Sequence, residues 1–341
     1  MYLCTRYDLP RFPLEQRTWG VFEFLYMRYT KRPLSIPEQV EKLKLRGLLI
    51  DDEQSAEGYL SNISYYRLRA YTFPFQENDD TSANHRFLRN DIHFSDIIDL
   101  YCFDRRLRFL MFNAIEKIEI AVRTKIVQVY AEATGDSHWF ANPHLYNNIT
   151  TKDKHGKATT KFALLMDEIT AEVKRSTEDF IKHYNHKYGD PVLPPAWMTL
   201  EVVSFGTLSK LYQLLKTSPQ KKQVAMSFGI KDDEVFSNWL HAIAVWRNYC
   251  AHHSRVWNRR CVVNVKLPKK HTYPFLDDAQ GSIRANKVFT ILCCIKYISN
   301  IISPGSEFKS NLVSIIAQSG QLLTIQEMGF VDNWEDMDVW K

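Results

Sequence analysis

The sequence predicts an all-α protein. Its 341 residues include only 12 glycines and 13 prolines, and 45% of them are hydrophobic. This composition is typical of helical globular proteins rather than of β-sandwiches or disordered chains. In the longer segments, apolar residues recur with the spacing of amphipathic helices. The chain is long enough for one large or two ordinary domains, with at most a small β element.

Residues 36–76 are expected to form a small helical module. Gly47 is placed to end the first helix in a left-handed conformation, and Asp51 or Asp52 can cap the second. The run SYYRLRAY then combines aromatic and basic residues, which suits base stacking and phosphate contact. The alternative is a bundle extension that only packs, because tyrosines at helix ends also fill ordinary cores.

Residues 94–130 predict one or two long helices, since a broad apolar stripe runs through them without Gly or Pro. On the polar side, Glu119 and Arg123 are four residues apart and are expected to form a supporting surface pair. The RRLR cluster that begins at Arg105 adds a second basic site.

The rest of the chain is expected to be helical, with polar connections. A loop is predicted at 135–160, a proline-rich connector at 189–198 and a short extended segment at 261–267. Asp233 is the expected N-cap of the helix that precedes the extended segment. The predicted helices cover residues 160–188, 197–217 with a break near Gly206, 233–252, 283–303 and 308–319.

One stretch of the chain, from Val235 to Leu276, contains no Asp or Glu. Its cationic residues are Arg247, Arg255, Arg259, Arg260, Lys266, Lys269 and Lys270, together with four histidines. The net charge of +5 is weak support for an anionic partner, but this local concentration predicts a positive field that suits RNA or DNA.

Inside that stretch, residues 246–260 read WRNYCAHHSRVWNRR. A metal site is disfavoured because Cys250 and His252 lie roughly 200° apart on a helix, whereas zinc ligands usually share one face. We therefore predict no metal and no cofactor. A surface histidine pair with ordinary arginine–carboxylate partners is the alternative, but the stretch has no acid of its own.

Metal-free RNA cleavage needs a base, an acid and a cation at the phosphorus, and histidine and arginine supply these. Arg247 and His252 are five residues apart, roughly 140° around a helix, so they do not face each other directly. Asn248 shares a face with His252 and can orient the imidazole or bind a phosphate oxygen. One Arg and one His per chain are few for this reaction, so the spacing predicts a second copy across a two-fold axis or a second half-site.

The run RNYCAHHSRVWNR (247–259) resembles the RN-x-CAHH-x-R-x-WNR signature of the Abi-like proteins (AbiD/AbiF type) of bacterial abortive infection. Its first six residues also resemble the R-[polar]-x3-H signature of HEPN ribonucleases. The blocks at 45–75 and 101–126 resemble that family's N-terminal block and central helix, in the same order. Together these blocks cover roughly residues 35 to 265.

The resemblance implies a HEPN-like helical bundle and a metal-independent endoribonuclease that acts as a toxin in phage defence. We expect three parts: a helical module at 1–90, a core at 91–265 that carries the motif, and a helical extension at 266–341. The extension lies outside the resemblance and is predicted from its helical pattern alone. The catalytic residues are then Arg247, Asn248 and His252, and a structured non-coding RNA is a further expected partner. The candidate RNA contacts are Arg255, Arg259, Arg260, Tyr65, Tyr66, Arg67, Arg69, Arg105 and Arg106.

Two competing functions are weaker. A non-catalytic RNA-binding regulator would use the same basic face but gains little from a fixed Arg-Asn and His-His. Nucleotide transfer would need a phosphate loop, and no Gly-rich loop is present in the sequence.

No apolar run approaches the ~20 residues that span a bilayer, and no signal-peptide core begins the chain, which predicts a soluble cytoplasmic protein. The six cysteines form no CxxC and are expected to be reduced.

Overall fold

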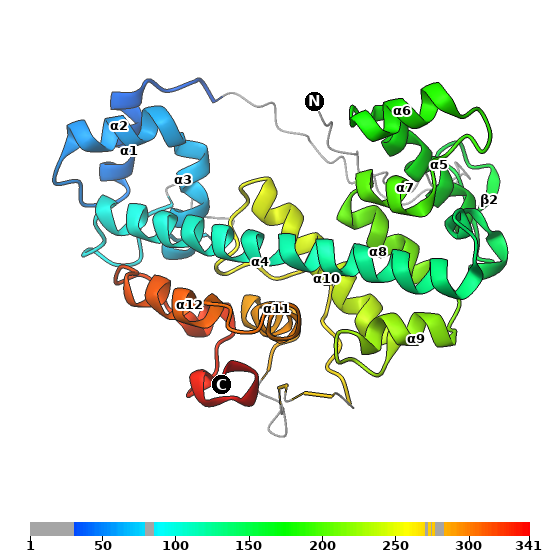
Figure 1. The fold of residues 1–341 in the computed structure, drawn as a ribbon. Helices are drawn as coiled ribbons and strands as arrows, with labels where there is room; N and C mark the ends of the chain where they lie inside the picture. The colour runs from blue at the N-terminus through cyan, green and yellow to red at the C-terminus, as the bar shows by residue number, and fades with distance from the viewer. Residues whose placement is uncertain (1–30, 79–84, 270–271, 274, 277–282) are drawn as a thin grey trace, which may run out of the picture.

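A computed structural model describes residues 31–78, 85–269, 272–273, 275–276 and 283–341. Cys4 and Lys270, which were considered above, lie outside these residues. One long helix, α4 (Phe94–Thr134), crosses the whole molecule, and the other helices are arranged around it (Figure 1). It ends at Gly135, whose φ of 65° is the left-handed conformation that glycine adopts at little cost. The all-α prediction is confirmed, and the central segment is one helix.

The N-terminal module packs at one end of α4, mainly through its third helix (Figure 1). Its elements are α1 (Ile36–Leu45), α2 (Glu53–Ile63), α3 (Tyr65–Thr72) and the 3-10 turn η1 (Phe73–Phe75). Gly47 has a φ of 93° just after the first helix, as predicted. Asp52 is the residue that caps α2, accepting the N–H of Ser55 at 2.9 Å.

A second group of elements surrounds the other end of α4 (Figure 1). They are η2 (Trp139–Ala141), η3 (Pro143–Leu145), β1 (Thr150–Lys152), β2 (Ala158–Thr160), α5 (Lys161–Arg175), α6 (Asp179–Lys187), α7 (Ala196–Val202), α8 (Phe205–Leu214) and α9 (Pro219–Met226). The segment predicted as a loop thus contains a short antiparallel pair, with Thr151 opposite Thr159. Helix α9 was not predicted, because it is short and mostly polar; Ser218 starts it by accepting the N–H of Lys221 at 3.1 Å.

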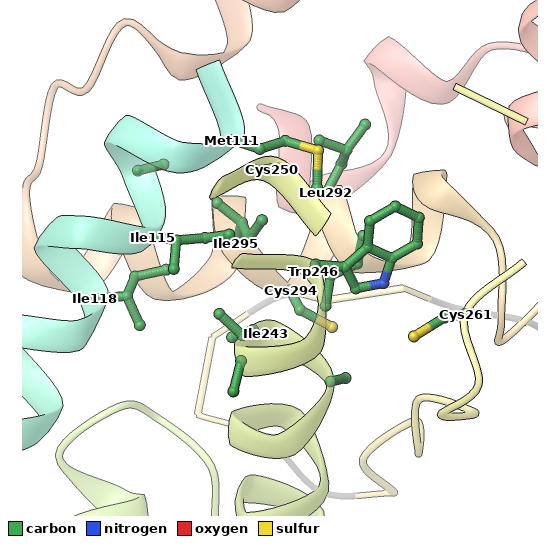
Figure 2. Packing of buried hydrophobic residues seen from close by; sticks show 14 of the residues in the cluster. Met111, Ile115, Ile118, Ile243, Trp246, Cys250, Cys261, Leu292, Cys294 and Ile295 are labelled. Carbon is green, nitrogen blue, oxygen red and sulfur yellow. The ribbon is translucent and has the colours of Figure 1, made fainter. Parts of the chain in front are cut away.

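Helix α10 (Asp233–Ala251) packs against α8, α4 and α11 (Val288–Ile302), and α12 (Phe308–Ala317) packs on α4. The N-cap of α10 is Asp232 rather than the predicted Asp233, since the Asp232 side chain accepts the N–H of Glu234 at 2.9 Å. Figure 2 shows the core where three helices meet. The side chains there include Met111 and Ile115 of α4, Trp246 and Cys250 of α10, and Leu292 and Ile295 of α11.

The segment 261–267 is irregular rather than a strand, although the N–H of Cys261 donates to Asn286 at 2.8 Å. The C-terminal tail forms η4 (Ile325–Met328), η5 (Trp334–Asp336) and η6 (Asp338–Trp340). Its Trp340 is buried against α11 and donates an N–H to the sulfur of Cys293 at 3.2 Å.

The five cysteines in the described residues carry no disulfide. Within the same residues, none of the helices combines the length and apolar character needed to cross a bilayer. The division of the chain at residues 90 and 265 stays a prediction.

Candidate functional site

The predicted motif lies at the C-terminal end of α10, where both adjacent histidines belong to one turn. His252 is the C-cap; the N–H of His253 donates to the carbonyl of Cys250 at 3.1 Å, and that of Ser254 to Tyr249 at 2.9 Å. These two bonds form a Schellman motif. His253 holds its left-handed position with a φ of 54°, where a residue with a β-carbon costs about 1 kcal/mol relative to glycine. A histidine at this position is therefore not explained by backbone stability.

Arg247 is held by two side chains of α4. Its Nε lies 3.9 Å from Oε2 of Glu119, and its guanidinium carbon lies 5.6 Å from the ring centre of Phe112. The side chain is 35% exposed, and a guanidinium has five donors, so it can still bind an anion. The motif's own stretch contains no acid, but the fold brings one beside it from α4.

Glu119 is half-buried. Its Oε1 accepts a hydrogen bond from Nη2 of Arg123 at 2.8 Å. Arg123 is buried, and its Nη1 donates to the carbonyls of Glu201 at 2.8 Å and Val203 at 3.1 Å, at the end of α7. The predicted pair of Glu119 and Arg123 is confirmed, but its placement at the surface is wrong, because the Arg123 side chain is only 8% exposed. Arg123 fixes the carboxylate that faces Arg247.

Asn248 and His252 are exposed at the end of the helix. The backbone links them, since the N–H of His252 donates to the Asn248 carbonyl at 2.9 Å. In the part of the chain that the structure describes, no hydrogen bond joins the Asn248 amide to the His252 imidazole. The orienting role of Asn248 stays a prediction, and both side chains are open to an incoming ligand.

A fully buried carboxylate, Asp104 of α4, lies beneath the motif loop, the part of the motif that follows the turn (residues 254–260). Its Oδ1 accepts the backbone N–H groups of Val256 at 3.0 Å and Trp257 at 2.7 Å. Its Oδ2 accepts the Tyr71 hydroxyl at 2.7 Å and pairs with Arg108. Burial and the Asp104 charge raise the pKa of Tyr71 far above its ordinary value, so its hydroxyl remains a donor. One carboxylate thus joins the N-terminal module, α4 and the motif loop.

Two arginines predicted to contact RNA bind backbone carbonyls across this junction. Nη1 of Arg255 donates to the carbonyl of Ala70 in α3, and Nη1 of Arg67 donates to the carbonyl of His253 at 2.9 Å. Arg255 is half-buried, whereas Arg67 is exposed. Both side chains therefore hold the motif loop against the N-terminal module, and Arg67 remains accessible to a ligand.

The last two arginines of the motif, Arg259 and Arg260, differ in how far contacts within the protein engage them. The guanidinium of Arg259 lies 4.3 Å from the ring centre of Tyr249, and its Nε donates to the carbonyl of Arg255 at 2.6 Å. Arg260 is exposed. Of the two, Arg260 is the freer to contact a phosphate.

The predicted contacts in the module and in α4 also differ in exposure. Tyr66 is 85% exposed, while the hydroxyl of Tyr65 accepts a hydrogen bond from Arg46. Arg69 is half-buried, with its guanidinium 5.4 Å from the ring centre of Phe73. Arg105 is exposed, and Arg106 donates to Gln318, the C-cap of α12, at 2.6 Å. The structure thus leaves Tyr66 and Arg105 as the most open of these residues.

A cavity of about 540 Å³ lies beside the motif turn, between α3, α4 and the end of α10. It brings together three sequence-predicted features: the basic module, the RRLR cluster and His253, the second of the adjacent histidines. The residues that line it include Arg67, Tyr101, Arg105, Phe109, Phe112 and His253.

Sequence reasoning missed several of these residues. Asp104 and Arg108 occur four residues apart within the apolar stripe of α4, and a charged pair at core positions is a usable signal of a buried network. Glu119 was expected only as the partner of Arg123, and Phe109 and Phe112 carried no distinctive pattern. The role of all three beside the motif depends on what α10 places next to them.

The structure brings no metal-ligand cluster to the motif: among the described residues, no three His, Cys, Asp or Glu side chains are grouped as ligands. Burial raises the pKa of the Cys250 thiol to about 12, which keeps it protonated near neutral pH. A protonated thiol is a poor metal ligand and a poor nucleophile.

The site therefore has the form of a cationic turn supported by a long helix, and the comparisons with known proteins give its class. The sequence model of one family, described as Abi-like protein, matches residues 58–258. The chain belongs to this family, as its motif predicted. Membership links it to abortive infection, a form of phage defence. No curated protein and no solved structure matches the chain.

Proposed function

We propose that this Abi-like protein is a metal-independent HEPN endoribonuclease that acts as an abortive-infection toxin. The observation that carries the proposal is the Arg-Asn-x3-His sequence at the end of α10. There Arg247 is held by Glu119 and Phe112 of α4, while Asn248 and His252 stay exposed. A fixed cation beside open polar groups is the arrangement that phosphate chemistry needs.

The reaction divides among these residues by their chemistry. A neutral imidazole removes the proton of the 2′-OH, whose oxygen then bonds to phosphorus while the bond from phosphorus to the 5′-oxygen breaks. An imidazolium gives a proton to the departing 5′-oxygen. Arg247 stabilises the negative charge that develops on the phosphate oxygens. The products are a 2′,3′-cyclic phosphate and a free 5′-hydroxyl.

The reaction uses two imidazoles in opposite protonation states, and the signature supplies one per chain, His252. We propose that a homodimer brings the second, across a two-fold axis between two copies of the turn. A structured non-coding RNA is the further partner that we propose, bound by the exposed cations of the module and of the RRLR cluster.

The activity is tested with purified protein and a labelled RNA in the presence of EDTA. We expect cleavage with cyclic phosphate ends, and a loss of about 10²–10⁴-fold in His252→Ala, the usual contribution of a general acid or base. Expression of the wild type should be toxic, and His252→Ala should relieve the toxicity. Undiminished toxicity of His252→Ala would refute the proposal. RNA binding without cleavage under any condition would favour the RNA-binding regulator.

The shared site is tested by mixing subunits. A tenfold excess of His252→Ala should place most wild-type chains in mixed dimers, and activity per wild-type chain should fall roughly tenfold if both histidines are required. The matched control is a tenfold excess of a variant altered far from the site, Lys182→Ala, which should cause no loss of activity. Undiminished activity with excess His252→Ala would mean that one chain carries a complete site.

A further inference from the structure

The cavity beside the motif turn combines aromatic and cationic walls. Tyr101, Phe109 and Phe112 supply rings from α4, and Arg67, Arg105 and His253 supply cationic or titratable groups from three different elements. Of the described residues that line it, none is acidic. Asp104, which pairs with the lining residue Arg108, is fully buried and already accepts hydrogen bonds from four residues. The walls therefore suit a ligand with a flat ring and a negative charge.

The size of the cavity limits the ligand. About 540 Å³ lies within the range of pockets that bind one small molecule or cofactor, roughly 300–1,000 Å³. It is too small for a helical duplex and sufficient for one nucleotide with its base turned out of a strand. Recognition of RNA commonly uses unstacked bases placed on aromatic rings with arginine at the phosphate.

Two side chains are positioned in ways that folding alone does not explain. Phe109 is 59% exposed on α4, and the guanidinium of Arg105 lies 5.1 Å from its ring centre. His253 lines the same cavity from a left-handed backbone position at which glycine is favoured. An exposed aromatic ring and a strained residue that line one cavity mark a binding site rather than a packing defect.

We infer that this cavity is a subsite that binds one nucleotide, with the base on Phe109 and the phosphate on Arg67 and Arg105. The inference rests on the proposed function, since it names how that site holds its substrate. Arg67 connects the cavity to the motif turn, because it lines the cavity and also donates to the carbonyl of His253 at 2.9 Å. A nucleotide seated there lies next to the turn that carries His252.

The test measures binding, so that it does not depend on cleavage. Full-length protein carrying His252→Ala is titrated with a labelled six-nucleotide single-stranded RNA, and with AMP and UMP as competitors. We expect Phe109→Ala and Arg105→Ala each to weaken RNA binding about tenfold. His253→Gly should weaken it several-fold although it suits the backbone, so that a loss cannot be attributed to misfolding.

The matched controls are neighbours in the loop before α4. Leu88 is 64% exposed, and Arg89 is exposed and paired with Asp91; neither lines the cavity. Arg89→Ala makes the same change as Arg105→Ala, and Leu88→Ala removes a large exposed apolar side chain as Phe109→Ala does; both should bind like the parent. Competition by AMP or UMP at the affinity of the RNA would identify a free nucleotide as the ligand. Binding of the RNA alone would identify a nucleotide within a strand.

Failure of the subsite and failure of the proposed function give different results. If the three cavity variants bind RNA as the controls do, or if the parent binds none of the probes, the subsite is refuted, whether or not the wild type cleaves RNA. If the cavity variants lose binding while wild-type protein cleaves nothing, the subsite stands and the endoribonuclease proposal fails.

Discussion

The N-terminal module meets α4 through two carboxylates in very different surroundings. Asp104 is completely buried and binds Tyr71, Arg108 and two backbone N–H groups of the motif loop. Asp51 lies at the surface and pairs with His93, just before α4, at 2.6 Å, with side chains that are 72% and 37% exposed. Both carboxylates pair with a basic side chain, but water competes only for the exposed pair of Asp51 and His93.

The difference shows which contacts position the motif. A buried charge that loses its partner pays its desolvation cost without compensation, whereas an exposed pair is replaced by water and screened by salt. Only the buried junction reaches the motif loop, through Val256 and Trp257. The geometry of the site should therefore depend strongly on Asp104 and little on the junction at Asp51.

The largest effect is expected for Asp104→Ala. The substitution leaves Arg108 buried without its carboxylate and removes the acceptor of two loop N–H groups, so unfolding free energy should fall by about 3–5 kcal/mol. Urea denaturation followed by circular dichroism measures it. Asp104→Asn, which keeps an acceptor oxygen, should lose less, and Asp51→Ala should shift the midpoint only slightly. Equal losses in Asp104→Ala and Asp51→Ala would contradict the comparison.

Arg255→Ala tests the same junction from the loop side. Arg255 donates to the carbonyl of Ala70 in α3, and loss of a charge-assisted hydrogen bond in a half-buried setting should cost about 1.5–3 kcal/mol of unfolding free energy. Arg260→Ala is the control, because Arg260 is exposed in the same stretch. It should leave stability within about 0.5 kcal/mol and weaken RNA binding, with a smaller salt dependence. If Arg260→Ala lost stability while Arg255→Ala lost only RNA binding, Arg260 would be the structural arginine and Arg255 the RNA contact.

The sequence predicts most of the fold because periodicity is a local property. The apolar stripes of α4 and α10 identify both helices, and the capping Asp of α10 is missed by one residue only because two aspartates are adjacent. Helix α9 escapes prediction because its polar sequence buries few residues, namely Lys221, Val224 and Ala225.

The site is predictable only in part, for the same reason. The signature residues are contiguous, so the motif and the family follow from the sequence. The partners of the motif come from distant positions: Arg67 reaches His253, Glu119 faces Arg247, and Tyr71 and Asp104 meet beneath Val256. No spacing rule relates such residues, since tertiary packing alone brings them together. The predicted pair of Glu119 and Arg123 does form, but not at the surface, because Arg123 is buried and bonded to carbonyls at the end of α7.

His253→Gly should separate stability from function at the turn that ends α10. Glycine has no β-carbon to strain a φ of 54°, so unfolding free energy should rise by about 1 kcal/mol. Part of this gain is offset because glycine is freer in the unfolded chain. Denaturation and RNA titration on one preparation test the expectation, which is a more stable protein with weaker binding. A less stable protein would mean that the His253 imidazole stabilises the fold.

The smallest effect is expected at the exposed junction and depends on pH. The hydrogen bond that the His93 ring N–H donates to the Asp51 carboxylate raises the pKa of His93 above its ordinary value of 6.5. Because the folded-state pKa is the higher one, the pair stabilises the protein fully below about pH 6.5 and loses that contribution as pH rises through the folded-state pKa. Wild-type protein should therefore gain stability relative to His93→Gln on going from pH 8 to pH 6. Thermal midpoints of the two proteins at both pH values measure this, and Asp51→Asn should remove the pH dependence as well. A difference that is constant with pH would show that the pair does not form in solution. A difference as large as that of Asp104→Ala would mean that the exposed junction stabilises the protein as much as the buried one.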